Sequence, residues 1–322
     1  MTAQPIDLAS RLDDAHLQVL NALPPDLLDL SDIPKTRAGM AGLLAALPTP
    51  DLPDEVTIED VHVPGHDGDP DVLVRLYRRS GLGPAAPALY WIHGGGMVLG
   101  SVDMNDFDSA IRALRLDCVV ASVEYRLAPE HPFPAPMNDC YAGLTWLAVN
   151  ADQLGVDPDR IVIGGASAGG GLAAGLALMA RDRGGPGIAF QLLVYPMLDH
   201  RNSTASSHAI ADTRVWNRDA NLAGWAAYLG DTDRVSPYAS PAIAEDLSGL
   251  PPAYINVGEL DMFLDEDVAY AMALNRAGVP VELHVYPGAF HGSNGFVTES
   301  PLSDRWKADE RAALRRALHG DG

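Results

Sequence analysis

Short apolar runs recur along the chain and alternate with stretches of helical spacing. The apolar runs predict buried strands near residues 56–64, 71–79, 87–92, 118–125, 161–164, 188–196, 253–257 and 281–286. From the third strand onward, helices are expected near 105–116, 138–151, 168–182, 266–277 and 303–318. This alternation predicts an α/β fold with a mostly parallel central sheet and helices on both faces.

Two segments depart from this alternation. Only the turn His66-Asp-Gly-Asp-Pro70 separates the first two strands, so we expect a hairpin that makes an antiparallel edge. Within residues 200–235, a Ser/Thr/Asn-rich stretch leads into Trp216, Trp225 and Tyr228 at partly helical spacing. The pattern alone does not decide whether these aromatic side chains belong to the core.

Two glycine motifs directly follow predicted strands. His93-Gly94-Gly95-Gly96 follows the strand near 87–92, where bare backbone N–H groups can point at a substrate oxygen. Gly165-Ala-Ser167-Ala-Gly169 follows the strand near 161–164 and begins an Ala-rich helix, which is the setting of a nucleophile elbow. A bare GxSxG arises by chance in roughly one chain in five of this length. Both motifs in this order and context predict an acyl-transfer site.

Two other interpretations of the glycine-rich segment are weaker. Residues 161–180 carry no charge and have GxxxG spacing, but interrupting glycines and the preceding Asp157-Pro-Asp-Arg160 argue against a membrane span. Gly169, Gly171 and Ala174 fit a GxGxxA dinucleotide loop. They lie inside the predicted helix, however, where a phosphate would have no amide cradle.

A serine hydroxyl becomes nucleophilic only beside a base, and the base needs a group that orients it. Asp261 comes just after the strand near 253–257, and His291 just after the strand near 281–286. Because the carboxyl ends of parallel strands share one edge of a sheet, Ser167, Asp261 and His291 can converge. Their chain order is that of α/β-hydrolases.

Other acids and histidines have simpler explanations. Asp265 is the main rival of Asp261, but Asp265 and Glu266 are expected to cap the helix that begins there. Glu259 lies too close to the end of its strand. His284 is expected to pack within a strand, whereas His62, His66 and His319 are expected on the surface or in loops.

The residues resemble the hormone-sensitive-lipase-like carboxylesterases, or bacterial family IV, of the α/β-hydrolase fold. The resemblance covers most of the chain and extends beyond the two glycine motifs and the loops of Asp261 and His291. It includes Trp91-Ile-His-Gly-Gly-Gly96, Tyr125-Arg-Leu-Ala-Pro-Glu130 and Tyr195-Pro-Met-Leu-Asp199.

The resemblance implies a role for each matching residue. Ser167 would be the nucleophile, His291 the base and Asp261 its orienter. The backbone amides of Gly95, Gly96 and Ala168 would form the oxyanion hole, and His93 would brace the glycine loop without transferring a proton. The activity implied is a serine carboxylesterase that hydrolyses short- to medium-chain esters through an acyl-serine intermediate, with no metal or organic cofactor.

The resemblance also implies a helical cap over the pocket. Residues 1–46 and 200–235 would form the cap, and residues 47–199 and 236–322 the catalytic core. Two positions depart from the family pattern: Ala166 stands where Asp or Thr is usual, and Ser293 stands near a common aromatic position. Both leave the preferred ester open.

The same nucleophile could serve an amidase, a lactonase or a carbamate hydrolase. A non-catalytic small-molecule receptor is disfavoured, because relatives that acquired such a role lost a triad member and this chain has all three. The partner expected is therefore a small-molecule ester. The sequence leaves the oligomeric state open, with a homodimer as one candidate.

Composition narrows the remaining classes. The 322 residues can bury a large core, and a net charge of −21 disfavours nucleic acid and anionic membrane surfaces. Cys118 and Cys140 are expected to be buried thiols, since two cysteines provide neither a disulfide scaffold nor a zinc quartet. Residues 1–10 lack a basic segment followed by an apolar one, so we expect a cytoplasmic protein without stable membrane insertion.

Overall fold

The computed structural model describes residues 5–46 and 50–320, and the parts of the predicted cap and core at 1–4, 47–49 and 321–322 lie outside them. Within the described residues, an eight-stranded sheet has the order β1-β2-β4-β3-β5-β6-β7-β8. Its strands are β1 (Val56–Val63), β2 (Val72–Arg79), β3 (Ala86–Ile92), β4 (Val119–Glu124), β5 (Val156–Ala166), β6 (Phe190–Val194), β7 (Ala253–Leu260) and β8 (Val281–Phe290). Each predicted strand is found near its predicted position.

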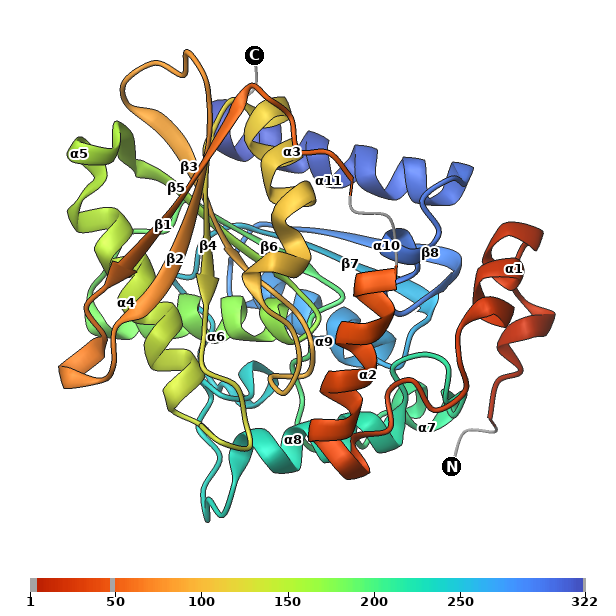
Figure 1. Ribbon diagram of the computed structural model, residues 1–322. Helices are drawn as coiled ribbons and strands as arrows, with labels where there is room; N and C mark the ends of the chain where they lie inside the picture. The colour runs from red at the N-terminus through yellow and green to blue at the C-terminus, as the bar shows by residue number, and fades with distance from the viewer. Residues whose placement is uncertain (1–4, 47–49, 321–322) are drawn as a thin grey trace.

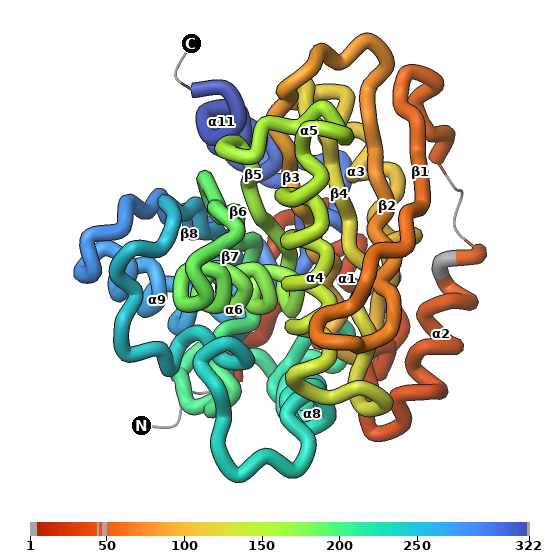
Figure 2. Tube along the Cα trace, turned by 90° about the vertical axis from the view of Figure 1, so that its left-hand side faces the viewer, coloured from red at the N-terminus to blue at the C-terminus, as the bar shows by residue number. Residues whose placement is uncertain are grey.

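The sheet is parallel except at β2. This strand pairs antiparallel with both β1 and β4, whereas every pair from β4 through β3 to β8 is parallel. The predicted hairpin and antiparallel edge are thus confirmed. Figure 2 shows the strands fanning from β1 on one side of the molecule to β8 on the other.

Helices cover both faces of the sheet, as predicted (Figure 1). On one face lie α3 (Asp106–Leu116) and α11 (Pro301–His319), and on the other lie α4 (Ala135–Val149), α6 (Ala168–Arg183) and α9 (Leu264–Arg276). Strand β3 is buried on both faces: Tyr90 and Ile92 join one apolar cluster, and Leu89 and Trp91 join the other. The alternation of side chains along a strand explains this division.

Further helices lie around this three-layer core. They are α1 (Asp14–Ala22), α2 (Ile33–Ala46), α5 (Ala151–Leu154), α7 (Ala205–Ala209), α8 (Arg218–Leu229) and α10 (Ser293–Phe296), with 3-10 turns at Leu8–Ser10, Leu30–Asp32, His66–Gly68, Val102–Asn105 and Pro241–Ile243. In the described part of the chain, no helix is both long and apolar enough to cross a membrane. Cys118 and Cys140 are buried free thiols, as predicted.

The N-terminal segment packs against the segment that interrupts the strand–helix alternation. The backbone N–H of Ile6 donates to the carbonyl of Ala209 at 2.9 Å, and Arg214 donates to Asn21 at 3.0 Å. Figure 1 shows α1 at the right of the view, with α2, α7 and α8 in its lower part. These two segments are therefore in contact although they are far apart in sequence.

Candidate active site

Ser167 occupies a strained turn between β5 and α6. Its φ of 57° and ψ of −121° lie in a region that L-residues rarely adopt. The flanking glycines permit the turn, because a Cβ at Gly165 would lie 2.3 Å from the Gly169 backbone. A Cβ at Gly169 would lie 2.1 Å from the carbonyl oxygen of Ile92. Only glycine fits at both places, which explains the GxSxG pattern.

Three side chains named from the sequence meet at the end of the parallel strands. His291 Nε2 lies 2.9 Å from Ser167 Oγ, and His291 Nδ1 lies 2.8 Å from Asp261 Oδ2. Asp261 is only 1 % exposed, and its other oxygen accepts a hydrogen bond from the Phe263 N–H at 3.0 Å. The carboxylate is thereby held with one oxygen toward the imidazole, an arrangement that fixes the tautomer of a general base.

Aromatic side chains enclose the imidazole of His291. Tyr195 and Phe263 contact it edge-on, with ring centroids 4.7 and 5.1 Å away, and Trp216 lies 6.5 Å away. Packing on these sides limits rotation of the ring away from Ser167. Tyr195 belongs to a motif quoted from the sequence, but nothing in that motif indicated that its side chain would touch the histidine.

The rival acids lie elsewhere. Asp265 Oδ2 accepts from the Ser206 N–H at 2.8 Å, and Glu266 Oε1 accepts from the N–H groups of Leu198 and Asp199 at 2.8 and 3.1 Å. The prediction that these acids cap their helix is wrong, because α9 begins at Leu264 without a side-chain cap. Instead, the Glu266 side chain points into the protein and accepts hydrogen bonds from the backbone N–H groups of the loop after β6. Burial raises the pKa of its carboxyl.

The other histidines take no part in this cluster. His284 packs against Tyr254 on the sheet, with ring centroids 5.1 Å apart, as its strand position predicts. His93 is 2 % exposed and stacks on Tyr125 at 4.2 Å, while its Nδ1 lies 2.8 Å from the Gly94 carbonyl oxygen. Burial lowers the pKa of His93 to about 4, so the ring is neutral near pH 7. The side chain thus has the contacts of a brace for the glycine loop.

The glycine loop carries its backbone close to Ser167. Gly95 and Gly96 have φ values of 117° and 62°, and a Cβ at Gly94 would lie 2.7 Å from the Ala166 carbonyl oxygen. Among residues 5–46 and 50–320, no protein acceptor takes a hydrogen bond from the backbone N–H of Gly95, Gly96 or Ala168. These amides are available to a substrate oxygen.

A cavity of about 290 Å³ opens beside Ser167. Its floor is the glycine loop and the Ser167–His291 pair, and its walls are mainly apolar side chains. These walls include Leu27, Leu28, Met40, Val215, Trp216 and Phe296. The leucines and Met40 come from the N-terminal segment, and no sequence signal marked them individually.

The three aromatic side chains that the sequence pattern left undecided are all buried in the large apolar cluster. Trp216 lines the cavity, and its Nε1 donates to Asn221 at 3.0 Å. Trp225 and Tyr228 are buried in the large apolar cluster. All three therefore belong to the core, and Trp216 in addition forms part of the cavity wall.

The chain is similar to proteins of known family and known structure. A family model described as alpha/beta hydrolase fold matches residues 89–294. Carboxylesterase NlhH from Mycobacterium tuberculosis is 41% identical over 275 residues, which is 84% of this chain and 86% of that protein. Esterase LipI from the same species is 37% identical over 311 residues, 96% of each chain. A solved bacterial heroin esterase is 44% identical with a TM-score of 0.92, covering 96% of this chain and 99% of that one.

Proposed function

The chain belongs to the alpha/beta hydrolase fold family, in its hormone-sensitive-lipase-like (bacterial family IV) branch, and is a serine carboxylesterase; from this premise, we propose that Ser167, His291 and Asp261 are its catalytic triad. The observation that carries the proposal is the pair of short distances, 2.9 Å from Ser167 Oγ to His291 Nε2 and 2.8 Å from His291 Nδ1 to Asp261 Oδ2. These distances are within reach of direct proton transfer in the resting protein.

The proposed reaction has two acyl-transfer steps. His291 takes the Ser167 proton as Oγ attacks the ester carbonyl carbon, and then gives that proton to the departing alcohol. Water next attacks the acyl-serine carbonyl and gives a proton to His291, which returns it to Ser167 Oγ as the C–Oγ bond breaks and the carboxylic acid leaves. Asp261 stabilises the imidazolium that forms in each step.

We propose that the backbone amides of Gly95, Gly96 and Ala168 form the oxyanion hole. The positive φ of both glycines and the closeness of the loop to Ser167 support this assignment. Ala168 is the first residue of α6, so its N–H has no partner within the helix and lies at the positive end of the helix dipole. Each such donor can stabilise the tetrahedral intermediate by about 3–4 kcal/mol.

Two parts of the chain are proposed to form a cap over this site: residues 1–46 and residues 200–235. Residues 47–199 and 236–322 would then form the catalytic core. The support is that Met40 and Trp216, one from each cap segment, line the cavity beside Ser167. A volume of about 290 Å³ is at the lower end of small-molecule pockets, which favours short- to medium-chain acyl groups.

The Ser167→Ala variant tests the triad. We expect its hydrolysis of 4-nitrophenyl butyrate to fall by several orders of magnitude and its labelling by a fluorophosphonate probe to disappear. Circular dichroism should be unchanged, and Ser248→Ala, an exposed serine, serves as the matched control. If Ser167→Ala keeps more than about a tenth of the wild-type rate, the assignment of the nucleophile is wrong. A series of 4-nitrophenyl esters from acetate to palmitate tests the acyl-length proposal.

The homodimer and the cytoplasmic location remain proposals that rest on the sequence alone. Size-exclusion chromatography with light scattering tests the first, since a dimer has twice the mass of the chain. Immunoblotting of cell fractions tests the second.

A further inference from the structure

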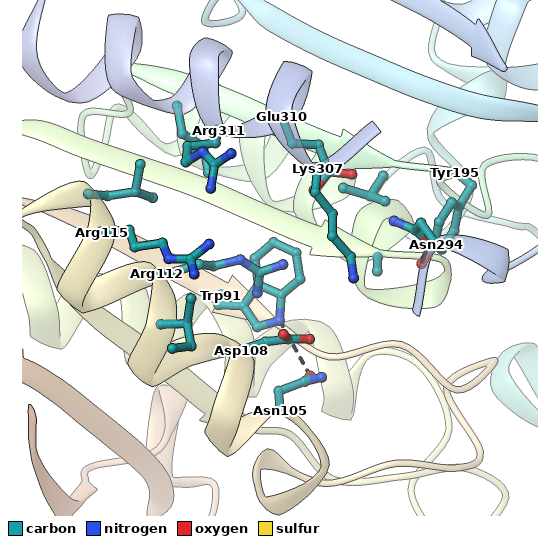
Figure 3. Close-up of a pocket in the computed structure, with 15 residues that line it drawn as sticks. Trp91, Asn105, Asp108, Arg112, Arg115, Tyr195, Asn294, Lys307, Glu310 and Arg311 are labelled. Carbon is teal, nitrogen blue, oxygen red and sulfur yellow. Dashed lines mark hydrogen bonds between the residues drawn. The ribbon is translucent and has the colours of Figure 1, made fainter. Parts of the chain in front are cut away.

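A second cavity, of about 200 Å³, lies between α3 and α11 (Figure 3). We name this cavity the α3–α11 pocket, and Trp91 forms part of its wall. It is separate from the cavity beside Ser167, and the proposed reaction makes no use of it.

Four cationic side chains line the α3–α11 pocket: Arg112 and Arg115 from α3, and Lys307 and Arg311 from α11. Figure 3 shows them projecting from the two helices around one space. Within the described residues, none of the four forms an ion pair, and the Arg112 Nη1 is buried without a hydrogen-bond partner. The chain as a whole has a net charge of −21, so this group of unpaired cations makes the pocket positive within a negatively charged protein.

Two carboxylates also line the α3–α11 pocket, Asp108 and Glu310, so the lining still carries two net positive charges. Glu310 is already engaged, because its Oε1 accepts a hydrogen bond from Asn256 at 2.9 Å. Burial raises the pKa of Glu310, and the charge of the nearby Arg112 acts in the opposite direction. The Arg112 guanidinium is held over the Trp91 ring at 3.8 Å and therefore stays in the pocket wall.

A buried amide adds a neutral donor to these cations. Asn294 is 8 % exposed, and its Oδ1 accepts a hydrogen bond from the Tyr195 hydroxyl at 3.2 Å. Its Nδ2 has no acceptor among the described residues, and Figure 3 shows this nitrogen on the side of the pocket. This nitrogen is therefore free to donate a hydrogen bond to a ligand in the pocket.

The α3–α11 pocket shares a wall with the catalytic cavity. Asn105, Ala166 and Tyr195 line both spaces. Ala166 directly precedes Ser167 and contributes only a methyl group. The Trp91 Nε1–H donates to Asn105 Oδ1 at 3.4 Å, a long and weak hydrogen bond, so rotation of Asn105 costs little.

We propose that the α3–α11 pocket binds the carboxylate at the far end of an acyl chain, so that monoesters of dicarboxylic acids are preferred substrates. The inference rests on the proposed role of Ser167, because the acyl group must be attached beside the shared wall. A carboxylate matches the lining, since guanidinium groups bind it through two parallel hydrogen bonds and the Asn294 amide can donate to it as well. The remaining acidic surface repels anions, so binding depends on these local cations.

Kinetics with paired substrates test the proposal. The 4-nitrophenyl monoesters of adipic and suberic acid are compared with 4-nitrophenyl hexanoate and octanoate, which have the same chain lengths without the carboxylate. We expect Lys307→Met and Arg311→Met each to lower the ratio of kcat/KM, charged over neutral substrate, by about tenfold, because hydrogen bonds to charged groups are among the stronger ones. Added salt should lower the wild-type ratio too.

A matched control removes the same charge elsewhere. Arg276→Met, at an exposed position at the end of α9, should leave the ratio unchanged. Thermal unfolding of each variant verifies that it is folded. If wild-type protein hydrolyses the neutral esters while neither Lys307→Met nor Arg311→Met changes the ratio, the proposal is overturned and the triad assignment stands.

Calorimetry separates this proposal from the proposed function. Adipate is titrated into the Ser167→Ala protein, which cannot turn over an ester if the triad is correct. Binding that weakens about tenfold when Lys307→Met is added supports the pocket even without catalysis. If adipate binds but the kinetic ratio is unaffected, the pocket holds a free anion and the substrate preference proposed here is wrong.

Discussion

Arg37 links α2 to the loops that follow β3 and β4. Its Nε donates to the Val98 carbonyl at 2.8 Å and its Nη2 to the Ala128 carbonyl at 2.7 Å. The guanidinium also forms an ion pair with Glu130, at 2.7 Å from Nη1 to Oε1. Val98 follows the glycine loop and α2 carries Met40, so Arg37 joins the proposed cap to the proposed oxyanion hole. We therefore predict that Arg37→Met loosens α2.

The size of the effect follows from these contacts. Hydrogen bonds from a charged donor contribute about 1.5–3 kcal/mol each. Because the Arg37 side chain is 28% exposed, we discount the two carbonyl contacts to about 1–2 kcal/mol each. The Glu130 side chain is 51% exposed, and the ion pair contributes about 0–1 kcal/mol. The loss of about 2–5 kcal/mol shifts the ratio of docked to undocked α2 by roughly 30- to 4,000-fold.

Hydrogen exchange measures this shift directly. Amides of residues 37–46 should exchange faster in Arg37→Met by about that factor if they open as one local unit, while amides of β3 and β5 should not change. The KM for 4-nitrophenyl butyrate should rise, because Met40 no longer closes the cavity. Glu130→Gln is the control: it removes only the ion-pair charge and should change exchange by less than about fivefold. Equal exchange in Arg37→Met and wild type, or equal effects of the two variants, would contradict this reasoning.

Three further predictions concern the catalytic cavity. Asp261→Asn should lower kcat by about 10³–10⁴-fold, because it disturbs the tautomer of the base, while Asp265→Asn should not; reversal of this order would assign the orienting role to Asp265. Gly96→Ala places a Cβ 2.2 Å from the Trp216 Cη2 at a φ of 62°. It should cost about 1–2 kcal/mol in backbone strain and lower kcat, with partial recovery when Trp216→Ala is added; full activity of Gly96→Ala alone would refute the steric argument. The pKa of His93 is about 4 in the folded protein and about 6.5 in the unfolded protein. Between pH 6.5 and pH 4, therefore, the unfolded state binds a proton on His93 and the folded state does not. Stability in urea unfolding should therefore fall by about 2 kcal/mol more between pH 7 and pH 5 in the wild type than in His93→Asn, and parallel pH profiles would show that His93 is not the cause.

The positions of the strands and of the glycine motifs follow from local pattern. A short apolar run that is buried on both faces, such as residues 86–92, is typical of an interior strand of a parallel sheet. Glycines at 95, 165 and 169 are required by backbone contacts that the strand-to-loop setting already implies. Because parallel strands end at one edge, the sequence could also bring Ser167, Asp261 and His291 to the same place.

Side-chain direction required the tertiary structure. Asp261 and Asp265 differ little in sequence context, yet the turn before α9 points the first at His291 and the second at Ser206. Glu266 looked like a helix cap, but packing of α9 against the sheet buries it against the loop after β6. The helix propensities of the residues do not specify which side of a helix faces the sheet.

The sequence by itself determined the sheet, the elbow and the side chains that could meet at its edge, because each depends on nearest-neighbour sterics and on the period of apolar positions. Only the tertiary structure decided which distant segments wall the cavity, that Trp216 faces it while Trp225 does not, and that α3 and α11 gather unpaired cations behind Ala166. These features arise where segments far apart in the chain pack together, and the free energy that selects them comes from contacts that no single stretch of sequence contains.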